Sequence, residues 1–169
     1  MKLIFHLLFT ILLLSSCQKE TTISSTNEVN WEKRFAQVPL KDSLVSGTSY
    51  LSVYSQIYSQ NDQKTHDLTV TVSMRNTNVK DTIYINKATY FNTNGDAIRK
   101  YFQQPIFIPP MATVEIIIDE RDQEGGTGAN FLFDWSVDKS SNEPLFEAIM
   151  ISTSNQQGLS FTTQGIKVD

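Results

Sequence analysis

The chain has 169 residues, of which 40% are hydrophobic and 11% aromatic, so it holds enough apolar mass for one domain with a real core. Its single cysteine excludes an intramolecular disulfide framework and a zinc site built from several thiolates. The formal net charge of −4 lacks the basic footprint of a nucleic-acid binder, so we expect no nucleic-acid partner.

Residues 1–16 predict a lipoprotein signal peptide that is removed before Cys17. Lys2 gives a positive start, and residues 3–14 form an apolar run interrupted by His6 and Thr10. As a helix, this run spans about 18 Å, well short of the roughly 30 Å hydrocarbon core of a bilayer. The run is therefore typical of a signal-peptide core rather than a membrane span.

The residues Leu14-Ser15-Ser16-Cys17 resemble a bacterial lipobox, in which an aliphatic and two small residues precede the cysteine. Small side chains let an extended backbone enter a peptidase cleft, and the thiol is the acceptor for diacylglycerol. Acyl chains on Cys17 would anchor the mature protein, since each buried CH₂ contributes about 0.8 kcal/mol. The alternative is an ordinary secretory signal with a chance cysteine.

The residue after Cys17 is Gln18 and not Asp, so the inner-membrane retention signal of enterobacterial lipoproteins is missing. We therefore expect a lipid-anchored protein of the bacterial cell envelope, located at the outer membrane. The sequence leaves open whether it faces the periplasm or the cell surface.

Residues 17–44 read as a lipid-anchored tether, small and polar at first and then aromatic. The aromatic part predicts a short helix over 30–38, capped by Asn30 and stopped by Pro39. Its apolar positions follow the helical i, i+4, i+7 spacing: Trp31, Phe35 and Val38. This helix would either dock its aromatic side chains on the domain edge or lie in the membrane interface beside the anchor.

From residue 45 to residue 169 the apolar period changes to two, which predicts strands. We expect strands at 50–58, 66–75, 83–90, 98–102, 106–108, 113–119, 131–137, 145–153 and 159–163. Asn94-Gly95 is a strong hairpin signal. Turn signals at intervals of about 8–12 residues predict an all-β fold, an antiparallel two-sheet β-sandwich of the immunoglobulin or fibronectin type III kind with 8–9 strands.

For two strands of this sandwich the sequence also predicts which residues are buried. Trp135 shares a strand face with Phe131, Phe133 and Val137, so we expect it at the centre of the core. The strand at 145–153 is almost wholly apolar, which predicts burial on both of its faces.

Four segments carry a resemblance to a known family: Val53–Tyr58, Val72–Thr77, Gly125–Phe131 and Gln157–Phe161. Over roughly residues 45–168 the chain is similar to an uncharacterised bacterial family known only as a domain of unknown function. The resemblance implies an exported or lipid-anchored bacterial protein without an assigned activity. It supplies no catalytic residues.

The loop at 119–130 is the richest candidate site, because it combines acids with glycines. Its candidate residues are Asp119, Glu120, Asp122, Glu124, Gly125, Gly126, Gly128 and Asn130. The acids partly follow the spacing of a calcium loop, but the twelfth position is Phe131, which excludes a helix-loop-helix calcium site. A looser calcium site stays open, as does a metal-dependent envelope hydrolase that uses these acids. No other cofactor is expected.

The second interpretation of this loop is structural. Glycine permits the positive φ that a tight inter-strand loop requires, and the Asn130 amide can satisfy two backbone groups of the loop. A loop with a fixed conformation can present a binding surface to a partner.

An aromatic surface is the remaining candidate, formed by Tyr50, Tyr54 and Tyr58 on one face of a single strand. Such a row would stack sugars or a peptide, or it would pack beneath a neighbouring loop. Hydrolytic catalysis lacks parts, because His66 is the only histidine after the signal peptide and no Gly-x-Ser-x-Gly motif is present. We therefore expect a binding or accessory module with an envelope protein or glycan partner, and not an enzyme.

Overall fold

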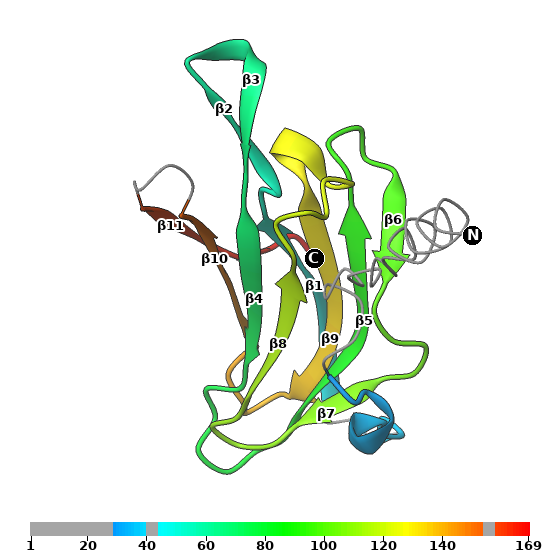
Figure 1. Cartoon of the computed structure of the whole chain (residues 1–169). Helices are drawn as coiled ribbons and strands as arrows, with labels where there is room; N and C mark the ends of the chain where they lie inside the picture. Colours follow the sequence, from blue (N-terminus) through cyan, green and yellow to red (C-terminus); the bar gives the residue numbers. More distant parts are fainter. Residues whose placement is uncertain (1–28, 40–43, 154–157) are drawn as a thin grey trace, which may run out of the picture.

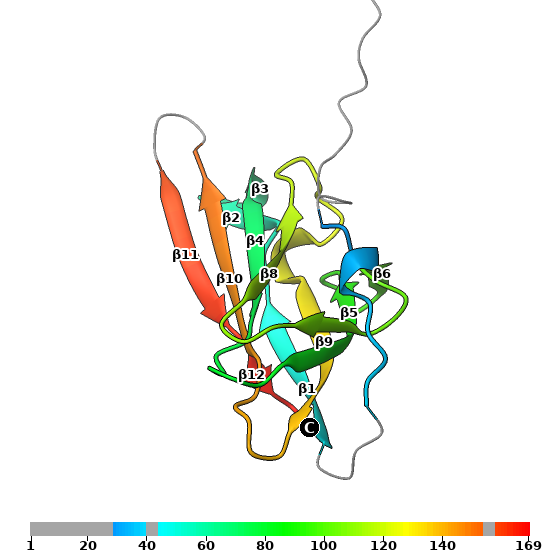
Figure 2. The same ribbon diagram turned by 90° about the horizontal axis from the view of Figure 1, so that it is seen from below.

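The computed structural model describes residues 29–39, 44–153 and 158–169, and these fold into two antiparallel sheets packed face to face (Figures 1 and 2). The predicted all-β sandwich is confirmed. The expected count of 8–9 strands was too low, because the described residues form twelve strands.

The six-stranded sheet has the order β12-β1-β9-β5-β6, with β7 beside β5. Its strands are β1 (Leu44–Ser52), β5 (Ile83–Phe91), β6 (Ala97–Lys100), β7 (Ile106–Ile108), β9 (Asn130–Asp138) and β12 (Ile166–Lys167). The four-stranded sheet has the order β11-β10-β4-β8. Its strands are β4 (Thr69–Arg75), β8 (Thr113–Ile118), β10 (Leu145–Ser152) and β11 (Leu159–Gln164). A separate hairpin pairs β2 (Gln56–Ser59) with β3 (Asn61–Asp67).

The core lies between the sheets and is organised by the inward face of β9. Trp135 is 0% exposed, as predicted, and its Nε1 donates a hydrogen bond to Ser49 Oγ at 2.9 Å. Phe133 stacks on Phe131 with ring centroids 5.3 Å apart and on Phe146 at 4.2 Å. Because Phe146 belongs to β10, this aromatic stack joins the two sheets.

The strand expected at 50–58 is interrupted. β1 ends at Ser52 and β2 begins at Gln56, after which the β2–β3 hairpin projects beyond the body of the sandwich (Figure 1). Ser55 lies in the break, is 0% exposed, and accepts a backbone hydrogen bond from Leu68 at 2.9 Å. Leu51, Val53 and Ser55 are all buried, so burial at every second residue continues through the break between β1 and β2.

The prediction that residues 145–153 are buried on both faces was wrong. Ile149 and Ile151 on β10 are 40% and 42% exposed, whereas Phe146, Ala148 and Met150 face the core. The outer face of the four-stranded sheet is open, so apolar residues there do not report burial.

The segment before the sandwich forms one 3-10 turn over Glu32–Arg34, shorter than the helix expected over 30–38. Phe35 is extended and bridges Ile106, while the Trp31 ring packs on Phe102 at a centroid distance of 5.2 Å. The segment docks on the domain, as the first interpretation of its aromatic residues expected. Cys17 and the rest of 1–28 lie outside the described residues, and within those described no helix is long and apolar enough to cross a membrane.

Candidate functional site

The loop at 119–130 connects β8 in the four-stranded sheet to β9 in the six-stranded sheet, so it crosses from one layer to the other. The turn at 92–96 and the β2–β3 hairpin lie at the same end of the sandwich (Figure 1). We call these three segments the hairpin end. A 3-10 turn, η3 (Gly126–Gly128), lies inside the loop and contacts β2.

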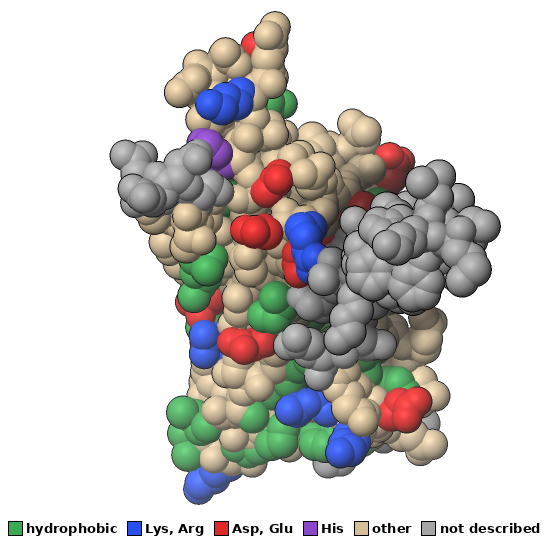
Figure 3. Space-filling view, in the orientation of Figure 1, with side chains coloured by type: hydrophobic (Ala, Val, Ile, Leu, Met, Phe, Trp, Pro, Cys, Tyr) green, Lys and Arg blue, Asp and Glu red, His purple; other side chains and the backbone are tan. Residues whose placement is uncertain are grey.

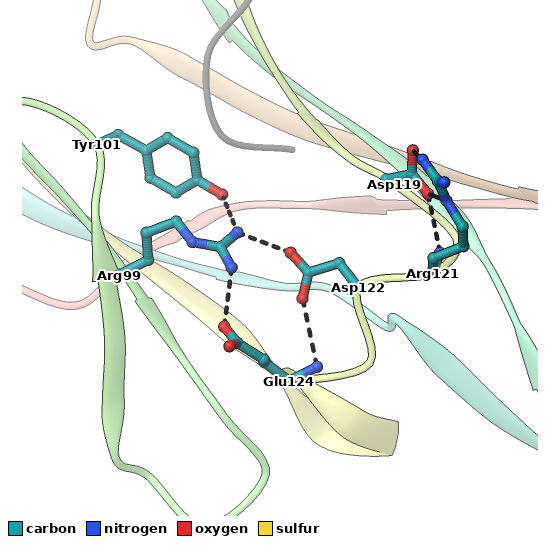
Figure 4. Close-up of polar contacts among 6 residues, drawn as sticks. All are labelled: Arg99, Tyr101, Asp119, Arg121, Asp122 and Glu124. Carbon is teal, nitrogen blue, oxygen red and sulfur yellow. Dashed lines mark hydrogen bonds and ion pairs between the residues drawn. The ribbon is translucent and has the colours of Figure 1, made fainter. Parts of the chain in front are cut away.

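Arg99 from β6 holds the acidic half of the loop (Figure 4). Its Nη1 donates to Asp122 Oδ2 at 2.8 Å and its Nη2 donates to Glu124 Oε2 at 2.8 Å. Tyr101 Oη accepts a weaker hydrogen bond from Nη1 at 3.3 Å. Asp122 is only 3% exposed, so its charge is compensated by Arg99 rather than by water. We call this arrangement the Arg99 clamp.

The protonation states within the Arg99 clamp follow from burial and pairing. Burial lowers the pKa of Arg99, but hydrogen bonds to Asp122 and Tyr101 more than offset this effect and raise it above its ordinary value. Burial also raises the pKa of Tyr101, although Arg99 opposes part of that rise. Arg99 therefore stays charged and Tyr101 neutral near pH 7, so these two groups neither take up nor release protons there.

The other acids of the loop are arranged differently. Asp119 Oδ1 accepts hydrogen bonds from the Arg121 backbone N and Nε at 3.0 and 2.9 Å, and Oδ2 accepts one from Nη2 at 2.9 Å (Figure 4). Glu120 is exposed. Among the described residues, no group of three or more His, Cys, Asp or Glu side chains could hold a metal ion.

The glycine-rich half of the loop is held by side chains from other segments. Thr93 in the turn at 92–96 donates its backbone N and its Oγ1 to the Gly125 carbonyl, each at 3.0 Å. The same Oγ1 accepts a hydrogen bond from Gly128 N at 2.9 Å, and Ser55 Oγ donates to the Gly126 carbonyl at 3.2 Å. Gly126 has φ of 73°, a left-handed conformation that favours glycine.

Within the described part of the chain, the Asn130 side chain makes no hydrogen bond to the loop backbone, so the bracing role predicted for it finds no support there. Asn130 is the first residue of β9, where it pairs with Ser52 on β1 and Phe91 on β5. The bracing role passes to Thr93, because the turn at 92–96 packs directly on the glycines.

Gly125 is required by the close approach of Tyr90. A Cβ at this position would lie 1.9 Å from Tyr90 Oη and 2.8 Å from the Ala129 Cβ. Tyr90 is 0% exposed, and its hydroxyl has no partner of hydrogen-bonding geometry within the described chain. Burial raises the pKa of Tyr90 well above its ordinary value, while the nearby Ser55 opposes part of that rise.

The β2–β3 hairpin is joined to the loop through Asp67. Gln123 Nε2 donates to Asp67 Oδ2 at 3.0 Å, and Gln56 Nε2 donates to Asp67 Oδ1 at 2.8 Å. The loop, the turn and the hairpin are therefore one connected surface rather than three independent loops.

The predicted tyrosine row does not form, because β1 ends before Tyr54. Tyr50 lies on β1, the Tyr54 ring packs against Phe161 at a centroid distance of 5.8 Å, and Tyr58 lies on β2. Tyr58 is 61% exposed and is the one member of the row at the hairpin end.

Sequence reasoning missed Arg99, Tyr101, Thr93 and Ser55. Arg99 and Tyr101 are two residues apart, so a strand would place both on one face. Arg99 also carries the positive charge that compensates the acids of the loop. That pattern was the available signal. Thr93 and Ser55 form hydrogen bonds to the backbone of the loop, and no sequence pattern predicts such contacts.

The comparisons with known proteins concern this same domain. The family described as "Protein of unknown function (DUF3124)" matches residues 46–168, from within β1 to the residue after β12. The chain belongs to this family. The resemblance to a domain of unknown function is thereby confirmed, and the DUF3124 family has no described activity.

No curated protein matches this DUF3124 member. A solved structure described as "Crystal Structure of Thermotoga maritima 1070" is similar at 9% identity and a TM-score of 0.45. The similarity covers 71% of this chain and 92% of the Thermotoga maritima chain.

Proposed function

We propose that the protein is a lipid-anchored component of the bacterial outer membrane that acts as a binding or accessory module. Acylated Cys17 holds it to the membrane, and the hairpin end presents a surface to an envelope protein or glycan. The lipobox-like Leu14-Ser15-Ser16-Cys17 after a short apolar run supports the anchor.

The observation that carries the binding role is the bracing of the hairpin end. The Arg99 clamp fixes the acidic half of the loop, and Thr93 and Ser55 fix the glycine half. A surface that is already ordered loses little conformational entropy when a partner binds. Tyr58, 61% exposed on the projecting hairpin, adds the kind of aromatic contact that binding surfaces favour.

The alternative is a calcium site or a metal-dependent hydrolase that uses the acids of the loop. Either one would have to compete with arginine for Asp122 and Glu124, which lie 2.8 Å from the Arg99 guanidinium. Binding without metal needs no such rearrangement, so we prefer it. Calorimetry with millimolar calcium decides between them, because heat of binding would support the alternative.

The anchor is tested by Cys17→Ser in the full chain. We expect the unmodified protein in the membrane fraction and the Cys17→Ser protein in the soluble fraction, with equal thermal melting. Retention of the variant in washed membranes would refute lipid anchoring through Cys17.

The binding surface is tested by placing a photo-crosslinking residue at position 58 in cells. The matched control is position 166, because Ile166 is 62% exposed but lies on β12 at a sheet edge. We expect adducts of discrete mass at position 58 alone, with mass spectrometry telling a protein partner from a glycan. The same adducts at both positions, or none at position 58, would remove the hairpin end as the binding surface.

A further inference from the structure

Two large apolar side chains project from the end of the sandwich opposite the hairpin end. Val79, in the loop between β4 and β5, is 77% exposed, and Met111, between β7 and β8, is 67% exposed. The two loops are neighbours, because Met111 N donates a hydrogen bond to the Asn78 carbonyl at 3.1 Å. Hydrophobic side chains gather on the visible face of this end (Figure 3).

The loops that carry these two side chains are held by a pair of buried asparagines. Asn76 Nδ2 donates to the Asp81 carbonyl at 2.7 Å and to the Ile108 carbonyl at 2.9 Å. Asn78 Nδ2 donates to the Asn142 carbonyl at 2.9 Å, and its Oδ1 accepts a hydrogen bond from Asn142 N at 2.6 Å. Three loops are thereby tied together, so both apolar side chains are exposed on an ordered support.

Met111 also has an unusual backbone. Its φ is 59°, in the left-handed region that favours glycine and is strained for a long side chain. The Met111 side chain is mostly exposed, so core packing does not account for a methionine at this position. Such a backbone persists only where the surrounding structure holds it, and here it displays an apolar side chain next to the loop that carries Val79.

The segment that leads from Cys17 into the domain indicates which partner this end of the sandwich contacts. The docked segment enters the domain at the same end, since its 3-10 turn at Glu32–Arg34 lies beside β7 (Figure 1). Residues 18–28 separate Cys17 from Val29 and span at most about 40 Å when fully extended. The 3-10 turn follows Val29 by only three residues and contacts β7, so a membrane-bound Cys17 can hold this end of the sandwich against the bilayer.

We infer that this end of the sandwich, which we call the tether end, is a membrane-contact surface. Val79 and Met111 enter the interfacial zone of the bilayer to which Cys17 holds the chain, an inference that rests on the proposed lipid anchor. The exposed Lys80 beside Val79 supplies an ammonium group for lipid phosphates, while the Asp81 carboxylate accepts a hydrogen bond from Ser141 at 3.0 Å. Two apolar side chains bind weakly alone, but the anchor keeps them at high local concentration.

The experiment uses the lipidated protein in vesicles of phosphatidylethanolamine and phosphatidylglycerol. Cys17 is the only cysteine of the sequence, so Val79→Cys and Met111→Cys each introduce one free thiol for an environment-sensitive fluorophore. Asp62→Cys, on the exposed hairpin, is the matched control. Spin-labelled lipids in the same vesicles quench any fluorophore that reaches the interface.

We expect quenching at positions 79 and 111 at least twofold greater than at position 62, with a blue shift at these two positions. As a measurement without substitution, hydrogen exchange at 76–82 and 109–112 should slow when the unmodified protein joins vesicles, whereas exchange in the hairpin should not. If the protein binds vesicles but quenching is equal at all three positions, or stronger at position 62, the inference that the tether end contacts the membrane is wrong, whereas the proposed anchor stands. Failure of the protein to float with vesicles would overturn the anchor and this inference with it.

Discussion

Trp135, on β9, packs its ring against β1 and β12. A Cβ on Gly47 would lie 2.4 Å from the Trp135 ring, so the residue opposite it on β1 must be small. The Lys167 ammonium lies 5.2 Å from the ring centroid and covers it from β12. The indole also has a hydrogen-bond partner in Ser49.

Replacing Trp135 by alanine should lower the free energy of unfolding by about 3–5 kcal/mol, because a large cavity opens between the sheets. Urea unfolding followed by circular dichroism measures this loss. Tyr58→Ala is the control, since that side chain is 61% exposed and should change stability little. A Trp135→Ala protein with an unchanged midpoint would contradict the central position of this side chain.

Gly125→Ala should destabilise the protein by about 1–3 kcal/mol, because its Cβ would meet the rigid, buried Tyr90 hydroxyl. Adding Tyr90→Phe removes the atom that lies 1.9 Å away and should recover part of the loss. The matched control is Gly158→Ala, where an added Cβ has nothing within 4 Å. Equal melting temperatures for the two alanine variants would show that Tyr90 does not constrain the loop.

At the scale of elements, the loop at 119–130 is fixed mainly by partners outside itself. The ion pair between Arg99 and Asp122 joins side chains that are 18% and 3% exposed, so water screens it poorly. The pair between Arg121 and Asp119 is local and has a half-exposed arginine. The first pair therefore positions the loop against β6, whereas the second shapes only a surface turn.

Arg99→Met should lower the free energy of unfolding by about 2–3 kcal/mol, because it leaves the buried Asp122 carboxylate without its cation. Combining it with Asp122→Asn removes the negative charge that Arg99 compensates and should restore part of the stability. Arg121→Gln serves as the comparison and should leave the urea midpoint nearly unchanged. Similar losses for the two single arginine variants would contradict the distinction between the two pairs.

Much of the sandwich could be predicted from the sequence because burial imposes an alternating pattern on each core strand. The Asn94-Gly95 turn was predicted for the same local reason, and Gly95 has φ of 85°. β3 was not predicted in full, because its first residues project away from the core and carry no apolar alternation. The Arg99 clamp was missed since its partners lie 23 and 25 residues away, where only the fold brings them together.

At the scale of the whole molecule, the buried Tyr90 and the partly buried Tyr101 make the free energy of unfolding depend on pH in the alkaline range. Burial raises the pKa of Tyr90 and of Tyr101 in the folded protein. In the unfolded chain both ionise near pH 10, so ionisation favours the unfolded state above that value. Their contribution is fully present below about pH 10 and is lost as the pH rises further.

The free energy of unfolding should therefore fall above about pH 10, by up to about 1.4 kcal/mol per pH unit for each tyrosine. Tyr90→Phe should make that fall less steep, whereas Tyr58→Phe, at an exposed position, should not. Urea unfolding between pH 8 and pH 11.5 measures the slopes. Identical slopes for all three proteins would show that burial of Tyr90 does not drive the dependence.

The strand order has a consequence for synthesis. β1, the first strand among the described residues, lies between β9 and β12, so both of its edges are paired only after residues 130–138 and then 166–167 have been made. A ribosome makes the N-terminal end first, and pairing between segments this distant in sequence is slow. The nascent chain therefore exposes apolar strands until residues 166–167 have been made, and during that interval a holding chaperone could bind them.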